Sequence, residues 1–300
     1  MIRTVLIIGG SGFIGTHLSL KLREGFKVFS TFGRNLVRIP GVTPIPMRLE
    51  NRSSGRQILG LVKPDVVIYA AGSNDVEWSE RNPKETEKVH TAGAGSVSMV
   101  SELSTSRLIY LSNSYVFDGG RGNFHETDVA LPGSYLGKCK LGGENFIRGK
   151  SVNHLVLRLS PVLGRGNGLQ LTFFDQLRIA LSRGQRLTLS SNEIHSFVPI
   201  TTVVDVIGRL VEGSIKNRVF HYGGLTKLSW VDLARRFAKR FGFDPGLIMT
   251  KNSMLSKGVT EDGQPRPVDL SLNSTQLIES LKIKPFELEE MFSIFGESRN

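Results

Sequence analysis

The distribution of apolar positions predicts alternating strands and helices along the first half of the chain. Continuous apolar runs indicate buried strands, whereas apolar residues repeating every three or four positions indicate helices that bury one face. Strict alternation of the two predicts an α/β fold built on a doubly wound parallel sheet, with helices on both faces. The predicted strands are 4–8, 27–31, 65–70, 107–111 and 153–159, and the predicted helices are 13–24, 53–63, 84–104 and 136–149.

This rhythm changes after about residue 160, where turn-rich stretches alternate with short helices predicted over 229–241 and 286–295. We therefore expect a cofactor-binding domain over 1–160 and a smaller substrate-binding portion over 161–300, packed together with the chain crossing between them. In open parallel sheets, ligands bind in the crevice at the carboxyl ends of the strands. The sequence thus predicts a ligand site between the two parts.

The first predicted strand leads directly into a glycine-rich turn and then a helix. Gly9 allows a tight turn, Gly12 lets the backbone approach a pyrophosphate, and Gly15 lets the helix pack close to the strand. The helix N-terminus offers free N–H groups and a partial positive charge to phosphates. This context predicts a Rossmann-type dinucleotide site, with cofactor contacts from Gly9, Gly12, Phe13, Ile14 and Gly15.

The end of the second strand indicates which dinucleotide binds. An acidic residue there would accept the ribose 2′-hydroxyl of NAD, but the chain has Thr31, with Arg34 close behind. A hydroxyl and a guanidinium suit a 2′-phosphate, so we favour NADP(H), with NAD(H) as the alternative. The third strand ends in the small residues Ala70 and Ala71, which let the backbone pass close to the cofactor.

Composition argues against disulfide-rich, nucleic-acid-binding, membrane-spanning and metal-binding proteins. The single cysteine, Cys139, excludes an internal disulfide and fits a reducing cytoplasm. The net charge of +11 arises from 38 basic and 27 acidic residues that are scattered along the chain. We therefore expect anionic small molecules rather than nucleic acid as partners. No apolar run approaches the roughly 18 residues of a membrane span, and no spacing of Cys, His and carboxylates suggests a metal.

Several longer motifs together carry a family resemblance. They include Pro-Asp-Val-Val-Ile-Tyr-Ala-Ala, Ser-Asn-Ser-Tyr-Val-Phe-Asp-Gly and Lys-Leu-Gly-Gly-Glu, at 64–71, 112–119 and 140–144. With them, the chain resembles the extended short-chain dehydrogenase/reductases, and within these the dTDP-4-dehydrorhamnose reductases and their relatives. The resemblance implies reduction of the 4-keto group of a nucleoside-diphosphate deoxysugar. It also implies that a tyrosine donates the proton, a lysine holds the nicotinamide ribose, and a serine or threonine orients the carbonyl.

The expected catalytic residues are largely replaced. Lys140 stands at the lysine position, but Leu136 occupies the tyrosine position four residues earlier, and the nearby phenol is Tyr135. Residues i and i+5 of a regular helix point about 140° apart. Asn113 takes the hydroxyl position, and His90 takes that of an asparagine usual in the family. The candidate catalytic residues are therefore Lys140, Tyr135 and Asn113.

Three interpretations of this altered site remain open. In the first interpretation, the protein is catalytically silent and binds cofactor or sugar nucleotide for another purpose. The family's relatives include a regulatory subunit of methionine adenosyltransferase, so this fold can serve as a binding partner. Alternatively, other groups carry the chemistry, with a π-bulge near Gly137 returning Tyr135 and Lys140 to one helix face, or with His90 or Asn113 contributing. In the third interpretation, the site serves an unfamiliar reaction.

The resemblance also implies contacts to the nucleoside-diphosphate sugar and to other chains. Matching family segments line the substrate cleft, so we expect substrate contacts from His90, Arg158, His195 and Arg266. We also expect either a homodimer or a hetero-oligomeric partner.

Overall fold

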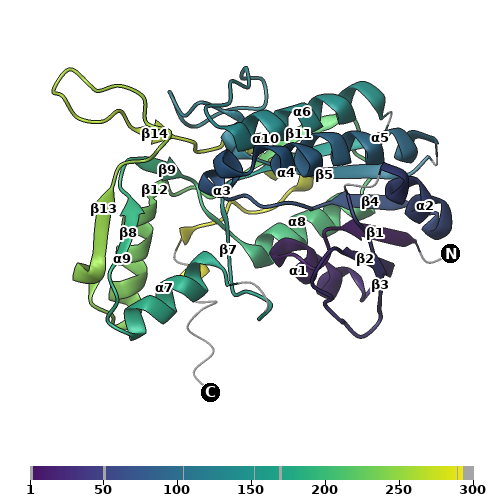
Figure 1. The fold of residues 1–300 in the computed structure, drawn as a ribbon, viewed down its shortest axis with the longest axis horizontal. Helices are drawn as coiled ribbons and strands as arrows, with labels where there is room; N and C mark the ends of the chain where they lie inside the picture. The colour runs from purple at the N-terminus through teal and green to yellow at the C-terminus, as the bar shows by residue number, and fades with distance from the viewer. Residues whose placement is uncertain are drawn as a thin grey trace.

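The computed structural model describes residues 3–49, 52–103, 105–151, 153–168, 171–288 and 290–292. A seven-stranded parallel sheet with helices on both faces forms the larger part, and smaller sheets and helices form a second part beside it (Figure 1). The predicted α/β class with a doubly wound parallel sheet is therefore confirmed. No helix among these residues is long and apolar enough to cross a membrane.

The main sheet has the strand order β11-β6-β5-β4-β1-β2-β3, and all neighbours run parallel. The five predicted strands are all present, and two further strands were missed. β3 contains Pro44 and Pro46, which lack an N–H group and are tolerated because β3 lies at the sheet edge. β11 is contributed by the later half of the chain. The strands are β1 Thr4–Ile8, β2 Lys27–Phe32, β3 Val42–Pro46, β4 Val66–Tyr69, β5 Arg107–Asn113, β6 His154–Leu159 and β11 Arg218–Tyr222.

Helices cover the two faces of this sheet and enclose two apolar cores. On one face α1 packs against α8, and on the other α5 packs against α2 and α6. The predicted helix over 84–104 is divided, because a π-helical turn interrupts it at Lys88–Gly93. The helices are α1 Phe13–Leu22, α2 Arg52–Val62, α3 Val76–Arg81, α4 Pro83–Glu87, α5 Ala94–Leu103, α6 Tyr135–Lys150, α8 Ile200–Glu212 and α10 Thr275–Leu281.

The smaller part has its own apolar core. Aromatic and aliphatic residues of α7 and α9 pack there against short strands. The chain returns from this part to the main sheet through α8 and β11, so residues beyond 160 belong to both parts (Figure 1). The predicted helix over 286–295 extends outside the described residues. The elements are β7 Val162–Leu163, α7 Phe173–Ser182, β8 Leu187–Ser190, β9 Glu193–His195, β10 Val198–Pro199, β12 Leu228–Ser229, α9 Trp230–Phe241, β13 Ile248–Lys251 and β14 Val268–Asp269.

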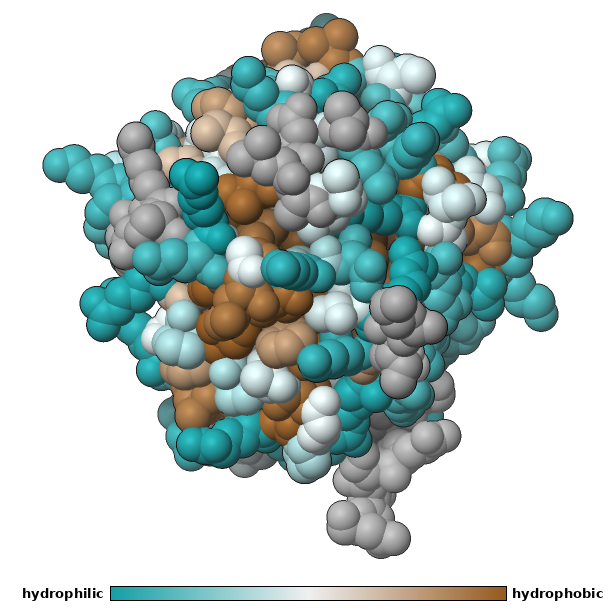
Figure 2. Space-filling model, turned by 90° about the vertical axis from the view of Figure 1, so that its right-hand side faces the viewer, coloured by the Kyte–Doolittle hydropathy of each residue, from teal (hydrophilic) through white to brown (hydrophobic). Residues whose placement is uncertain are grey.

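The side of the molecule near the start of β1 carries a hydrophobic area ringed by hydrophilic residues (Figure 2). A hollow at the edge where the strands begin is lined by basic side chains, including Arg3 and Arg107. Arg107 donates to the carbonyl oxygens of Gly213 and Ile215, directly after α8. Arg3 donates to the carbonyl oxygen of Val211, which lies in the last turn of α8. Cations at a helix C-terminus satisfy carbonyl groups that lack helical partners, so these arginines stabilise the end of α8.

Candidate functional site

The turn between β1 and α1 has the geometry of a phosphate-binding loop. Gly9 adopts a φ of 85°, which strongly favours glycine. A side chain at Gly15 would lie 2.3 Å from the Gly9 oxygen, so the helix can approach the turn only without one. Among the described residues outside its own chain neighbours and helix, an added Cβ at Gly12 would approach that same oxygen alone, at 3.2 Å. Gly12 therefore leaves open space in front of the turn, where a pyrophosphate would need it.

The first turn of α1 supplies the donors that an anion needs. Gly12 is the N-cap residue, and no side chain of the described chain caps this helix. The N–H groups of Phe13 and Ile14 consequently remain available for phosphate oxygens. From the later half of the chain, Asn167 Nδ2 donates to the Ser11 carbonyl oxygen at 3.2 Å. The residues present thus fit a dinucleotide, and Asn167 is a neighbour of the loop that the sequence did not reveal.

The two residues expected to select NADP(H) are placed differently. Thr31 is buried, and its Oγ1 accepts a hydrogen bond from Gly9 N at 3.0 Å. Thr31 therefore holds the glycine turn in place. Arg34 is exposed and makes no hydrogen bond or ion pair within the described residues. Ala71 lies under the turn, with its Cα 2.6 Å from the position of a Gly9 Cβ, and Ala70 precedes it at the end of β4.

Lys140 lies buried in α6, beside the carboxyl end of β5. Lys140 is only 4% exposed, and its Nζ donates a hydrogen bond to the Leu111 carbonyl oxygen at 2.9 Å. Burial lowers the pKa of Lys140 to about 7, against a smaller opposing effect of Glu144. One turn earlier, Leu136 is fully buried in an apolar cluster with Tyr115 and its neighbours. A hydrocarbon thus fills the position where the family carries its phenol.

The π-bulge proposed near Gly137 is absent from α6. Helix α6 is a regular α-helix from Tyr135, capped by the Ser134 hydroxyl, which accepts from Gly137 N at 3.1 Å. The Tyr135 phenol is half-buried beside Glu87 and Cys139, and burial together with these neighbours raises its pKa. Without a π-bulge, the five-residue offset directs Tyr135 and Lys140 to different sides of the helix.

The π-helical turn of the protein lies instead around His90. His90 Nε2 lies 2.9 Å from the Ser73 carbonyl oxygen, whereas Nδ1 is buried without a partner in the described chain. Burial and the charge of Lys140 hold the pKa of His90 well below its usual range, so the ring is neutral. Because Nε2 must then carry the hydrogen, Nδ1 is an unused acceptor.

Asn113 is the last residue of β5. Its Nδ2 donates to Asn74 Oδ1 at 3.0 Å, and its Oδ1 accepts from Tyr115 N at 3.1 Å. An amide nitrogen has two N–H groups, so one remains for a ligand. Asn113 therefore lies where the resemblance predicts a carbonyl-orienting group. Asn74 is a further site neighbour that the sequence did not reveal.

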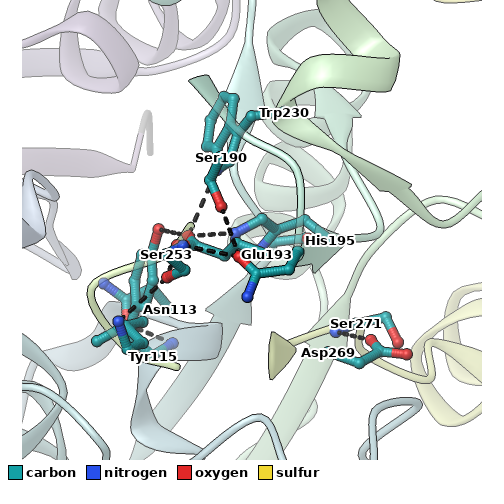
Figure 3. Close-up of polar contacts among 12 residues, drawn as sticks. Asn113, Tyr115, Ser190, Glu193, His195, Trp230, Ser253, Asp269 and Ser271 are labelled. Atoms are coloured by element: carbon teal, nitrogen blue, oxygen red, sulfur yellow. Dashed lines mark hydrogen bonds and ion pairs between the residues drawn. The ribbon is translucent and has the colours of Figure 1, made fainter. Parts of the chain in front are cut away.

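A carboxylate not predicted from the sequence joins the two parts of the protein. Figure 3 shows Tyr115, His195, Trp230 and Ser253 directed toward Glu193, and all four hydrogen-bond with its carboxylate. Burial alone would raise the pKa of Glu193, but the hydrogen bonds from His195, Ser253 and Tyr115 outweigh it and lower the pKa to about 2. The Glu-x-His spacing in β9 was the available signal, because alternate strand residues share a face.

Two of the residues expected to contact substrate, Arg158 and His195, are buried in the structure. Arg158 forms an ion pair with Glu144, with the closest atoms 2.7 Å apart, and Nη1 lies 3.2 Å from His221 Nε2. Arg158 is 3% exposed, and its ion pair connects β6 to α6. His195 is wholly buried against Glu193, with its Nδ1 unpaired within the described chain. Arg266 is exposed and donates to the Val259 carbonyl oxygen within its own loop, at 3.2 Å.

Comparison with known proteins identifies the family of this architecture. The model of the RmlD substrate binding domain matches residues 3–293, nearly the full chain. The chain belongs to this family. The RmlD-like assignment agrees with the sequence resemblance to extended short-chain dehydrogenase/reductases and covers both parts of the protein.

Individual RmlD-like relatives are distant and have different functions. The dTDP-4-dehydrorhamnose reductase of Aggregatibacter actinomycetemcomitans is 26% identical, covering 94% of each chain. Methionine adenosyltransferase 2 subunit beta of Pongo abelii is 23% identical over 80% of this chain and 72% of that protein. The fold matches a crystal structure of dTDP-4-dehydrorhamnose reductase from Bacillus anthracis in complex with NADP, with a TM-score of 0.81, 18% identity and 99% of each chain covered. The family uses nicotinamide cofactors, but its members do not share one activity.

Proposed function

We propose that this protein binds NADP(H) at the carboxyl edge of its main sheet and reduces the 4-keto group of a nucleoside-diphosphate deoxysugar. The observation that carries the proposal is the combination of an intact phosphate-binding turn with Lys140, which is buried and has no ion-pair partner among the described residues. An unpaired buried cation is costly to a fold. A buried lysine with a strongly perturbed pKa near the carboxyl ends of parallel strands therefore indicates a functional site.

Each site residue has a defined task in this proposal. The N–H groups at the start of α1 bind the pyrophosphate, and exposed Arg34 binds the 2′-phosphate. The reduced nicotinamide supplies the hydride when it is bound. The free N–H of Asn113 orients the keto oxygen, and Lys140 holds the ribose side of the cofactor. Among the residues expected to contact substrate, only exposed Arg266 remains a candidate for the diphosphate.

The reductase proposal is tested by following NADPH oxidation against a panel of 4-keto nucleotide sugars. We expect turnover with at least one of them, together with saturable NADPH binding in a fluorescence titration. Replacing Arg34 with alanine removes a charge-assisted hydrogen bond, so NADPH binding should weaken about 10-fold or more. NADH binding should change little. Preference for NADH in the unmodified protein would contradict the NADP(H) assignment.

A second candidate function is a catalytically silent subunit that binds cofactor and regulates a partner. Leu136 favours this alternative, because a buried hydrocarbon at the phenol position removes the usual proton donor. Loss of a general acid typically lowers the rate by on the order of 10²- to 10⁴-fold. Tight NADPH binding without turnover on any keto sugar would support this candidate and contradict the reductase.

A further inference from the structure

Lys140 is a buried lysine near the carboxyl end of β5 that has no ion-pair partner among the described residues. Lys140 Nζ makes a single hydrogen bond within the described chain, to the Leu111 oxygen, so two of its three N–H groups are uncommitted. Glu144 lies one turn further along α6, but its carboxylate is engaged with Arg158 at 2.7 to 3.2 Å. Lys140 is therefore held as a lone basic group next to the end of β5.

The surrounding titratable groups leave Lys140 as the group that exchanges a proton near neutral pH. His90, from the π-helical turn, is neutral because burial and Lys140 depress its pKa. Tyr110 of β5 lies with its ring 5.4 Å from Nζ, and burial raises its pKa well above the usual range. Burial also raises the pKa of Cys139, the preceding residue of α6. The described groups around Lys140 therefore do not change protonation near neutral pH, where Lys140 can release its proton.

Geometry also separates the alternative donors from the site. Leu136 provides no proton, and the Tyr135 phenol lies beside Glu87 and Cys139. The Tyr115 hydroxyl donates to Glu193 Oε1 at 3.1 Å. These arrangements leave the Lys140 ammonium, which donates to the carbonyl oxygen two residues before Asn113 in β5, as the available acid.

We propose that Lys140 itself donates the proton to the substrate keto oxygen, in place of the phenol that Leu136 has replaced. This inference rests on the proposed reductase function. A hydride from the reduced nicotinamide forms the new C–H bond, and the keto oxygen takes a proton from the Lys140 ammonium. The products are an alcohol, the oxidised cofactor and a neutral lysine amine, which regains a proton from solvent. Lys140 thereby acts as a general acid as well as a cofactor-binding cation.

The test separates proton donation from charge. Lys140→Ala should lower kcat by on the order of 10²- to 10⁴-fold. Methylammonium should restore activity at least 10-fold, whereas tetramethylammonium, which has charge but no proton to give, should not. Lys140→Arg should remain inactive at neutral pH while binding NADPH within a few-fold of the wild-type affinity, because a guanidinium does not release its proton. Activity of the wild-type protein should fall as the pH rises through about 7.

A readout independent of turnover completes the experiment. In protein labelled with ¹³C at lysine Cε, one resonance should titrate near pH 7 and be missing from Lys140→Met. Titration of that resonance above pH 9, or full activity in Lys140→Arg, would overturn the inference while leaving the reductase in place. Absence of turnover in the wild-type protein with every keto sugar would overturn the proposed function and this inference with it.

Discussion

Positions 12 and 15 of the nucleotide turn require glycine for different reasons. An added Cβ at Gly15 would overlap the Gly9 oxygen at 2.3 Å, so this glycine is required by the protein's own packing. Within the described part of the chain, an added Cβ at Gly12 would lie 3.2 Å from that oxygen, so relief needs a shift of only a few tenths of an ångström. The requirement for glycine at position 12 therefore comes mainly from the ligand, which must approach the backbone closely.

We predict that Gly12→Ala and Gly15→Ala separate binding from folding. Gly12→Ala should keep the melting temperature within about 2 °C of wild type, since a surface change typically costs within about 0.5 kcal/mol. NADPH affinity should fall at least 10-fold. Gly15→Ala should lower the melting temperature clearly, because the overlap forces the turn apart. Differential scanning fluorimetry and fluorescence titration measure both effects, and unchanged NADPH affinity in Gly12→Ala would contradict the placement of the pyrophosphate.

Helix α6 carries Lys140 and is fixed to the sheet by a buried ion pair. Glu144 of α6 binds Arg158 of β6, which in turn donates to His221 of β11. His221 is neutral, since burial and Arg158 lower its pKa to about 3. Its Nδ1 hydrogen is then donated to the Phe124 oxygen, 2.9 Å away. The helix that positions the site is thus connected through one chain of contacts to two strands and a loop.

Breaking this connection from one side should be more damaging than replacing it. Glu144→Ala leaves the Arg158 guanidinium buried and unpaired, which typically costs about 3–5 kcal/mol. The double variant Glu144→Leu/Arg158→Met replaces both charges with apolar groups of similar size and should recover most of that loss. Urea denaturation of wild type, both single variants and the double variant checks the result. Additive losses in the double variant would show that the pair does not act as a unit.

Polar contacts between the two parts make the stability of the protein depend on pH. Glu193 joins Tyr115 of the main domain to β9, α9 and Ser253, and the exposed ion pair of Lys251 with Glu77 lies alongside, at 2.8 Å. The carboxylate contributes because it is anionic in the folded state down to a pH of about 2. An exposed pair such as Lys251–Glu77 contributes at most about 1 kcal/mol. The buried cluster should therefore dominate the connection.

We predict a stepwise loss of stability at low pH. Below pH 6.5 the unfolded chain protonates at His221, whereas the folded protein does not until about pH 3. Below pH 4.5 the unfolded chain also protonates at Glu193, whereas the folded protein keeps this carboxylate ionised down to about pH 2. Each such group lowers the free energy of unfolding by about 1.4 kcal/mol per pH unit between its two pKa values. Denaturation from pH 7 to pH 3 should show this loss, and Glu193→Gln should flatten it below pH 4.5. An unchanged slope in that variant would contradict the role of Glu193.

The α/β class, five strands of the main sheet and the nucleotide turn could be predicted from the amino-acid sequence, because periodicity and glycine spacing are local properties of the chain. The family resemblance, applied four residues before Lys140, also predicted Leu136 at the position of the phenol. The folded protein was needed to show that Tyr135 lies beside Glu87, that Arg158 and His195 are buried, and that Glu193 joins the two parts. These outcomes depend on contacts such as Tyr115 with Glu193, 78 positions apart, for which burial and hydrogen-bond geometry arise only when distant segments pack together.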